Sequence, residues 1–130
     1  MAETPQASVD MLVCKTCKRA DLPAADKPPG EQLYDKLTQA ELPAALRIES
    51  VACLSNCSNG CTVILRSAER WTYIYGNINP ESDFEQLCMG IDGYVKSHDG
   101  IVPWRERVTL FKKNCIARIP PALPQEDKAE

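Results

Sequence analysis

Short apolar runs flank one amphipathic segment in the first half of the chain. Residues 9–13 (VDMLV) and 47–52 (RIESVA) have the length and the apolar content of β-strands. Between them, leucines recur at helical spacing over residues 31–46, which predicts an amphipathic helix that is interrupted or ends near Pro43. This half of the chain therefore predicts a strand–helix–strand unit.

The period of the pattern changes in the second half. Residues 62–65 (TVIL) and 71–75 (WTYIY) are rich in β-formers and are separated by a short polar segment, so they predict a hairpin. The aromatic side chains of the second strand alternate, so they share one face, which we expect to pack on a helix. Residues 81–96 have apolar positions at helical spacing and predict a second helix, which Gly90 and Gly93 weaken.

The order strand, helix, strand, hairpin, helix is that of the thioredoxin-like α/β fold. We expect a single domain over residues 9–119, with a flexible N-terminus over residues 1–8. Residues 120–130 combine three prolines with charged residues and predict a disordered tail. Residues 101–118 show no clear period, and no element is assigned to them.

Charge, hydropathy and motif content exclude several classes of function. The net charge of −3 leaves no overall basic field to hold nucleic acid or an anionic membrane. No apolar run approaches the roughly 20 residues that a membrane-spanning helix needs, and the N-terminus lacks the pattern of a secretory signal, so we expect a cytoplasmic protein. The chain has one histidine and no phosphate-binding glycine loop or nucleophile motif, so it does not predict an enzyme.

Seven cysteines are the unusual feature of the composition. In a reducing compartment, clustered cysteines are more often metal ligands or redox thiols than disulfides, and an odd count argues against a fully paired framework. Five of them lie in two groups, namely Cys14 and Cys17, then Cys53, Cys57 and Cys61. We expect the other two, Cys88 and Cys115, to pack in the interior.

The two cysteine groups are predicted to meet at one place. Cys14 and Cys53 each follow a strand of the strand–helix–strand unit, whose strands are parallel, so both should emerge at the same edge of the sheet. Four thiolates suffice for an iron–sulfur cluster or for structural zinc. A third interpretation is a dithiol redox pair formed by Cys14 and Cys17.

Residues 51–61 (VACLSNCSNGC) resemble the second ligand loop of thioredoxin-like 2Fe–2S ferredoxins, which usually has the pattern Cys-Leu-Gly-x-Cys-x-x-Gly-Pro. The residues that match this pattern are Cys53, Leu54, Cys57 and Gly60. Ser55 replaces the first glycine, and Cys61 stands where the proline is expected. The first motif departs further, because these ferredoxins usually separate their first two ligands by more than two residues.

The resemblance implies a one-electron carrier with one 2Fe–2S cluster near the surface. By position the resemblance implies Cys14, Cys53 and Cys57 as ligands, and we expect Cys17 to be the fourth, with Cys61 as the alternative. The resemblance also favours a homodimer, and zinc is the alternative metal. The whole chain is also similar to a family of small bacterial proteins described as predicted metal-binding, through residues 99–107 (DGIVPWRER) and 116–121 (IARIPP).

Basic residues gather near the C-terminal end of this acidic chain. They are Arg105, Arg107, Lys112, Lys113 and Arg118. One interpretation is a solvated face with internal ion pairs to Glu106. The other is a patch, Arg105 to Arg118, on which a redox partner protein with an acidic surface docks. Trp104 beside it fits either an interface anchor or core packing.

Overall fold

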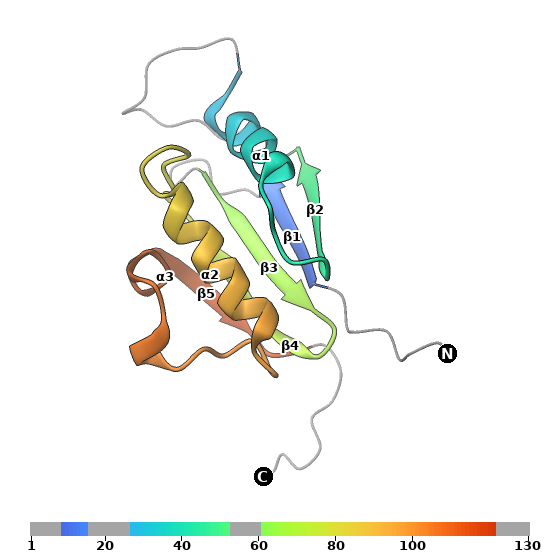
Figure 1. Ribbon diagram of the computed structural model, residues 1–130, viewed down its shortest axis with the longest axis vertical. Coiled ribbons are helices and arrows are strands. Elements are labelled where there is room, and N and C mark those ends of the chain that lie inside the picture. The colour runs from blue at the N-terminus through green and yellow to red at the C-terminus, as the bar shows by residue number, and fades with distance from the viewer. Residues whose placement is uncertain (1–8, 16–26, 53–60, 122–130) are drawn as a thin grey trace, which may run out of the picture.

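In the computed structural model, which describes residues 9–15, 27–52 and 61–121, a five-stranded sheet carries its longer helices on one face (Figure 1). The strand order is β2-β1-β3-β4-β5, with β1 and β2 parallel and the other neighbours antiparallel. The elements in chain order are β1 (Val9–Cys14), α1 (Pro29–Gln39), β2 (Leu46–Val51), β3 (Val63–Ser67), β4 (Arg70–Tyr75), α2 (Phe84–Lys96), the 3-10 turn η2 (Trp104–Glu106), α3 (Thr109–Lys113) and β5 (Cys115–Ile119). The predicted thioredoxin-like order is confirmed.

The hydrophobic core lies between the sheet and the two longer helices. In β1, Val9, Met11 and Val13 alternate and are fully buried, and their neighbours in β3 are buried on the same face. The helices contribute one apolar stripe each, Leu33 and Leu37 from α1 and Leu87, Ile91 and Tyr94 from α2. Burying one aliphatic side chain of this size stabilises the fold by about 1.5–3 kcal/mol, so this face fixes the register of the sheet.

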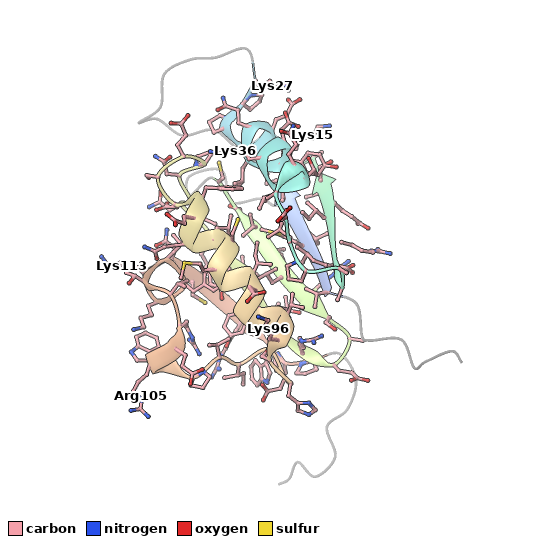
Figure 2. All side chains as sticks on the ribbon, viewed as in Figure 1. Lys15, Lys27, Lys36, Lys96, Arg105 and Lys113 are labelled. Carbon is pink, nitrogen blue, oxygen red and sulfur yellow. The ribbon has the colours of Figure 1, made fainter. Side chains whose placement is uncertain are left out.

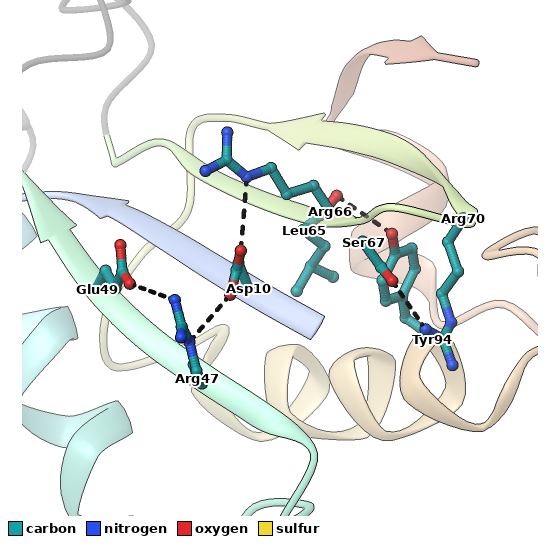
Figure 3. A network of polar contacts seen from close by, with 8 residues as sticks. All are labelled: Asp10, Arg47, Glu49, Leu65, Arg66, Ser67, Arg70 and Tyr94. Atoms are coloured by element: carbon teal, nitrogen blue, oxygen red, sulfur yellow. Dashed lines mark hydrogen bonds and ion pairs between the residues drawn. The ribbon is translucent and has the colours of Figure 1, made fainter. Parts of the chain in front are cut away.

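The opposite face of the sheet is charged at one end (Figure 3). Asp10 on β1 lies directly opposite Arg47 on β2 and Arg66 on β3, with nitrogen–oxygen distances of 3.2 and 3.8 Å. Arg47 also pairs with Glu49 at 2.8 Å. These pairs are largely exposed and are worth less than about 1 kcal/mol each, so they support a register that the buried face has already set.

The first helix differs from its predicted bounds. It begins at Pro29, where the fixed φ of proline suits the first helical position, so the helix starts earlier than expected. It ends at Gln39, because Ala40 is extended and Pro43 follows. Leu46, which the pattern assigned to the helix, is instead the first residue of β2.

Residues 101–118, which show no clear hydrophobic period, contain two short helical elements and most of a short strand. They are η2, α3 and β5, and none is long enough to show a hydrophobic period. All five residues of β5, one of the two edge strands, are exposed. Cys115 is its first residue, so the expectation that this thiol packs in the interior is wrong. Among the residues that the structure describes, no helix combines the length and the hydrophobicity needed to cross a bilayer.

Gly90 allows α3 to pack closely on α2. The ring of Phe111 stacks on Tyr75, with centroids 3.9 Å apart, and its other side faces Gly90. A Cβ atom on Gly90 would lie 2.4 Å from the nearest atom of the Phe111 ring, closer than van der Waals contact permits. The glycine that weakened the helix prediction is therefore a packing requirement. On Gly93 the nearest atom to such a Cβ is Val102 Cγ2, at 3.9 Å.

We expect Gly90→Ala to lower the free energy of unfolding by about 1–3 kcal/mol, because the added methyl group forces the Phe111 ring to move. Gly93→Ala is the matched control on the same helix, and should change stability by no more than about 1 kcal/mol, in the stabilising direction. Urea denaturation of both variants measures the difference. Equal stability of the two variants would contradict the packing described for Gly90.

Two buried tyrosines make the fold sensitive to alkali. Burial raises the pKa of Tyr75, and a nearby Cys115 thiolate would add to the shift. Burial also raises the pKa of Tyr94, whose hydroxyl donates to the carbonyl of Trp71 at 2.6 Å. Above pH ~10 the unfolded chain releases these protons while the folded chain retains them, so stability falls as the pH rises.

We expect the free energy of unfolding to fall above pH ~10, with each of the two tyrosines contributing up to about 1.4 kcal/mol per pH unit. Tyr75→Phe should remove one such contribution and make the decline shallower. Urea denaturation at a series of alkaline pH values gives the slopes. If Tyr75→Phe leaves the slope of unfolding free energy against pH unchanged, the Tyr75 hydroxyl does not cause the alkaline loss of stability.

Candidate metal centre

Three strands end or begin at one edge of the sheet. β1 ends at Cys14, which lies opposite Val51, the last residue of its parallel neighbour β2. The amide of Lys15 donates to the Val51 carbonyl at 2.9 Å, and the amide of Cys14 donates to the Thr62 carbonyl, just before β3, at 3.1 Å. We call the residues at this end, Cys14, Lys15, Val51, Ala52 and Cys61, the cysteine edge.

Cys14 is held rigidly at the cysteine edge. It is the last residue of a central strand that pairs with β2 on one side and β3 on the other. Its side chain is 1% exposed and belongs to the hydrophobic core cluster. A thiol in this position is shielded from water and fixed in direction by the strand, which suits a ligand more than a mobile surface thiol.

Cys61 is fixed at the same edge by backbone pairing. It is fully buried, its amide donates to the Ile78 carbonyl at 3.3 Å, and the Ile78 amide donates back to the Cys61 carbonyl at 3.2 Å. Ile78 is also fully buried. The residue before it, Asn77, adopts a left-handed conformation with φ 57°, which a non-glycine residue keeps only where the surroundings impose it.

The side chain of Asn114 supplies that constraint. Its amide nitrogen donates to the carbonyls of Gly76 and Asn77, both at 3.0 Å, and the backbone carbonyl of Asn114 accepts from the Gly76 amide at 3.0 Å. The turn of residues 76–78 is thereby fastened to Cys61 on one side and to the end of α3 on the other. The sequence indicates a turn here, but it carries no signal for these two long-range pairings.

The structure therefore locates only part of the predicted site. Cys14 and Cys61 both lie at the cysteine edge, since the Cys14 amide donates to the carbonyl of Thr62, the residue after Cys61. The other predicted ligands, Cys17, Cys53 and Cys57, lie outside the described residues. Within residues 9–15, 27–52 and 61–121, no three His, Cys, Asp or Glu side chains are grouped closely enough to hold a metal ion.

The remaining two cysteines are not part of the cysteine edge. Cys88 lies on α2, half-buried in a shallow groove beside Pro43 and Met89, and burial raises the pKa of its thiol, against the effect of Lys36. Cys115 is exposed at the start of β5, which two strands separate from β1. The places of Cys88 and Cys115 in the fold therefore separate both thiols from the cysteine edge.

Three lysines lie toward the cysteine edge (Figure 2). Figure 2 shows Lys15, Lys27 and Lys36 at the end of the molecule where β1 finishes. Lys15 directly follows Cys14 and is exposed, while the Lys36 ammonium donates to the Pro80 carbonyl at 3.0 Å. The Lys27 ammonium pairs with the Asp35 carboxylate at 2.6 Å, so its charge is balanced by a neighbouring acid.

Comparison with solved structures finds the same fold. The chain is similar to the wild-type thioredoxin-like 2Fe–2S ferredoxin from Aquifex aeolicus, with a TM-score of 0.53 and 14% sequence identity over 85% of this chain and 98% of that one. A second structure, described as a thioredoxin-like 2Fe–2S ferredoxin from Aquifex aeolicus, gives a TM-score of 0.52 and 16% identity over 90% of this chain and 98% of that one. At these identities the similarity establishes the fold alone.

Sequence comparison gives a family without an assigned activity. The family model described as "Protein of unknown function (DUF1636)" matches residues 11–121. No curated protein matches the chain. The matched description names neither a metal nor a reaction.

Proposed function

The chain belongs to the family described as "Protein of unknown function (DUF1636)", and we propose that it is an iron–sulfur electron carrier of the ferredoxin type. The proposed cofactor is one 2Fe–2S cluster, and the proposed ligands are Cys14, Cys17, Cys53 and Cys57. The single observation that carries the proposal is the parallel pairing of β1 and β2. It sets Cys14 opposite Val51, two residues before Cys53 in the sequence.

The donor chemistry at the cysteine edge fits such a cluster. Most 2Fe–2S clusters are held by four cysteine thiolates, and the sequence supplies a second cysteine close to Cys14 and two more soon after β2. Cys14 is buried at the end of a central strand, where pairing with β2 and β3 fixes its backbone. Three of the four proposed ligands lie outside the described residues, so the proposal rests on Cys14 and on the direction of the strands.

The protein's own residues would bind and shield the cofactor. When bound, a 2Fe–2S cluster accepts and releases a single electron. The thiolate of Cys14 would hold one iron from the rigid end of β1. The buried side chains around Cys14 and Cys61 would exclude water from that side, which is one of the factors that set the reduction potential of such a centre.

We expect anaerobically purified protein to be red-brown and to contain about two iron and two sulfide per chain. Dithionite should bleach the visible bands. Cys14→Ser, Cys53→Ser and Cys57→Ser should each lose most of the colour, because each removes one thiolate, whereas Cys88→Ser is the matched control and should keep it. The readouts are the visible spectrum and analysis of iron, sulfide and zinc.

A colourless protein with one equivalent of zinc, which anaerobic reconstitution with iron and sulfide fails to colour, would replace the carrier by a zinc- or metal-handling module. Full retention of the chromophore in Cys57→Ser would remove the proposed ligand set.

The fourth ligand is decided by a separate pair of variants. We expect Cys17→Ser to lose the cluster and Cys61→Ser to keep it. Cys61 already serves the fold, since it is fully buried and pairs with Ile78 through two backbone hydrogen bonds. Thermal unfolding of both metal-free variants separates a structural effect from a lost ligand. Loss of the cluster in Cys61→Ser alone, with unchanged stability of the metal-free chain, would make Cys61 the fourth ligand.

A further inference from the structure

Charge is distributed unevenly along this chain. Residues 104–118 contain five basic residues and one acidic residue, a net charge of +4, so the rest of the chain carries −7 against −3 for the whole. These residues form η2, α3 and β5. Figure 2 shows Arg105 and Lys113 on that side of the molecule, away from Lys96 at the end of α2. The basic residues therefore form a local feature of one side and not a general property of the protein.

Trp104 is exposed but held in place. Its side chain is 59% exposed, among the most exposed large apolar side chains that the structure describes. The Arg107 guanidinium and the Lys112 ammonium both lie 5.3 Å from the Trp104 ring centroid, and Arg107 is fixed in turn by donating to the Val102 carbonyl at 2.6 Å. The ring is therefore ordered before any partner arrives, so binding through it costs little side-chain entropy.

The cations around Trp104 are not neutralised within the described chain. In the part of the chain that the structure describes, no carboxylate forms an ion pair with the basic residues of this segment, and the expected internal pairs to Glu106 are not found. We call Trp104, Arg105, Arg107, Lys112 and Lys113 the basic surface. It combines an ordered aromatic anchor with arginine, the residue types enriched at protein–protein interfaces.

The basic surface is joined to the cysteine edge. Lys113 is the last residue of α3, and Asn114, the next residue, holds the turn of residues 76–78 through its side chain. The last residue of that turn, Ile78, pairs with Cys61 through two backbone hydrogen bonds. Few residues thus separate Lys113 from the edge where Cys14 lies.

From these observations we infer that the basic surface docks a partner protein through an acidic patch on that partner. The patch meets Arg105 and Lys113, and an apolar part of the partner covers Trp104. The choice of a protein as occupant rests on the proposed function, since an electron carrier needs a protein to serve. Within the basic surface, Lys113 is the residue next to Asn114, whose side chain holds the turn that pairs with Cys61.

The charge of the rest of the chain also argues against a nucleic acid or an anionic membrane as the occupant of the basic surface. A nucleic acid or an anionic membrane presents negative charge over a wide area, and the −7 of the remaining chain would repel it. A protein can restrict its acidic residues to the footprint of the basic surface. Exposed Ile116 and Ile119 on the adjacent β5 add apolar area, which a protein interface uses and a phosphate backbone does not.

The test measures binding of the full-length protein to a synthetic peptide of glutamates interrupted by leucines, by calorimetry at low and at physiological salt. We expect Arg105→Glu/Lys113→Glu to weaken binding roughly tenfold or more, because two attractions become repulsions. Trp104→Ala should also weaken it. Lys96→Glu is the matched charge control, on an exposed lysine remote from the basic surface, and should bind like the wild type.

Circular dichroism and thermal unfolding confirm that each variant is folded. An equal effect of Lys96→Glu would overturn the inference, as would tighter binding of duplex DNA or of phosphatidylserine vesicles than of the peptide. Absence of peptide binding at low salt would overturn it too. Because calorimetry does not read the cofactor, iron and sulfide analysis of the same preparation separates the two proposals. A cluster without peptide binding refutes only the docking surface, and peptide binding without a cluster refutes only the proposed carrier.

Discussion

The parallel pairing of β1 with β2 is the constraint on which the rest of the structure depends. Parallel strands finish at the same edge of a sheet. After the crossover through α1, β2 therefore ends at the edge where Cys14 stands. β3 then begins at that edge, beside Cys14, and runs antiparallel. One topological choice therefore brings three passages of the chain together, and two of the segments that leave or enter there carry most of the cysteines.

The two faces of the sheet stabilise this arrangement through different interactions. On the helix-covered face, alternating residues such as Met11 and Leu65 are fully buried, and sliding the register by one residue would expose the whole set. On the other face, Asp10 sits between Arg47 and Arg66, and the same slip would separate the charges. Hydrophobic burial contributes most of the stabilising energy, and the ion pairs favour the same strand register. A single native register requires this consistency between interactions.

The spacing of hydrophobic residues is enough to predict the strands and the helix that bury one regular row of apolar side chains. The four strands of the strand–helix–strand unit and the hairpin were placed nearly correctly, and so was α2, despite its glycines. The end of α1 was missed because leucines continue at helical spacing past Pro43, although the backbone is already extended at Ala40. η2, α3 and β5 were missed because each is too short to show a period and is held by tertiary contacts, such as that of Phe111 with Gly90.

For the candidate site, the sequence predicts that Cys14 stands at the end of a strand but not what stabilises this edge of the sheet. Cys14 follows from strand position alone. The double hydrogen bond of Cys61 with Ile78 does not, because backbone pairing between a loop and a distant turn leaves no mark on residue type. The basic residues were visible in the sequence as well. Their lack of carboxylate partners in the described chain, and the ordering of Trp104 between Arg107 and Lys112, are visible only in three dimensions.

The left-handed conformation of Asn77 connects these observations. A non-glycine residue with φ 57° is disfavoured on its own, so it persists because its neighbours over-determine it. Here the constraint comes from both sides, from Cys61 through Ile78 and from Asn114 through the carbonyls of residues 76 and 77. The turn cannot relax without loosening either the cysteine edge or the end of α3. The cysteine edge and the end of α3 are therefore held in one geometry through this turn.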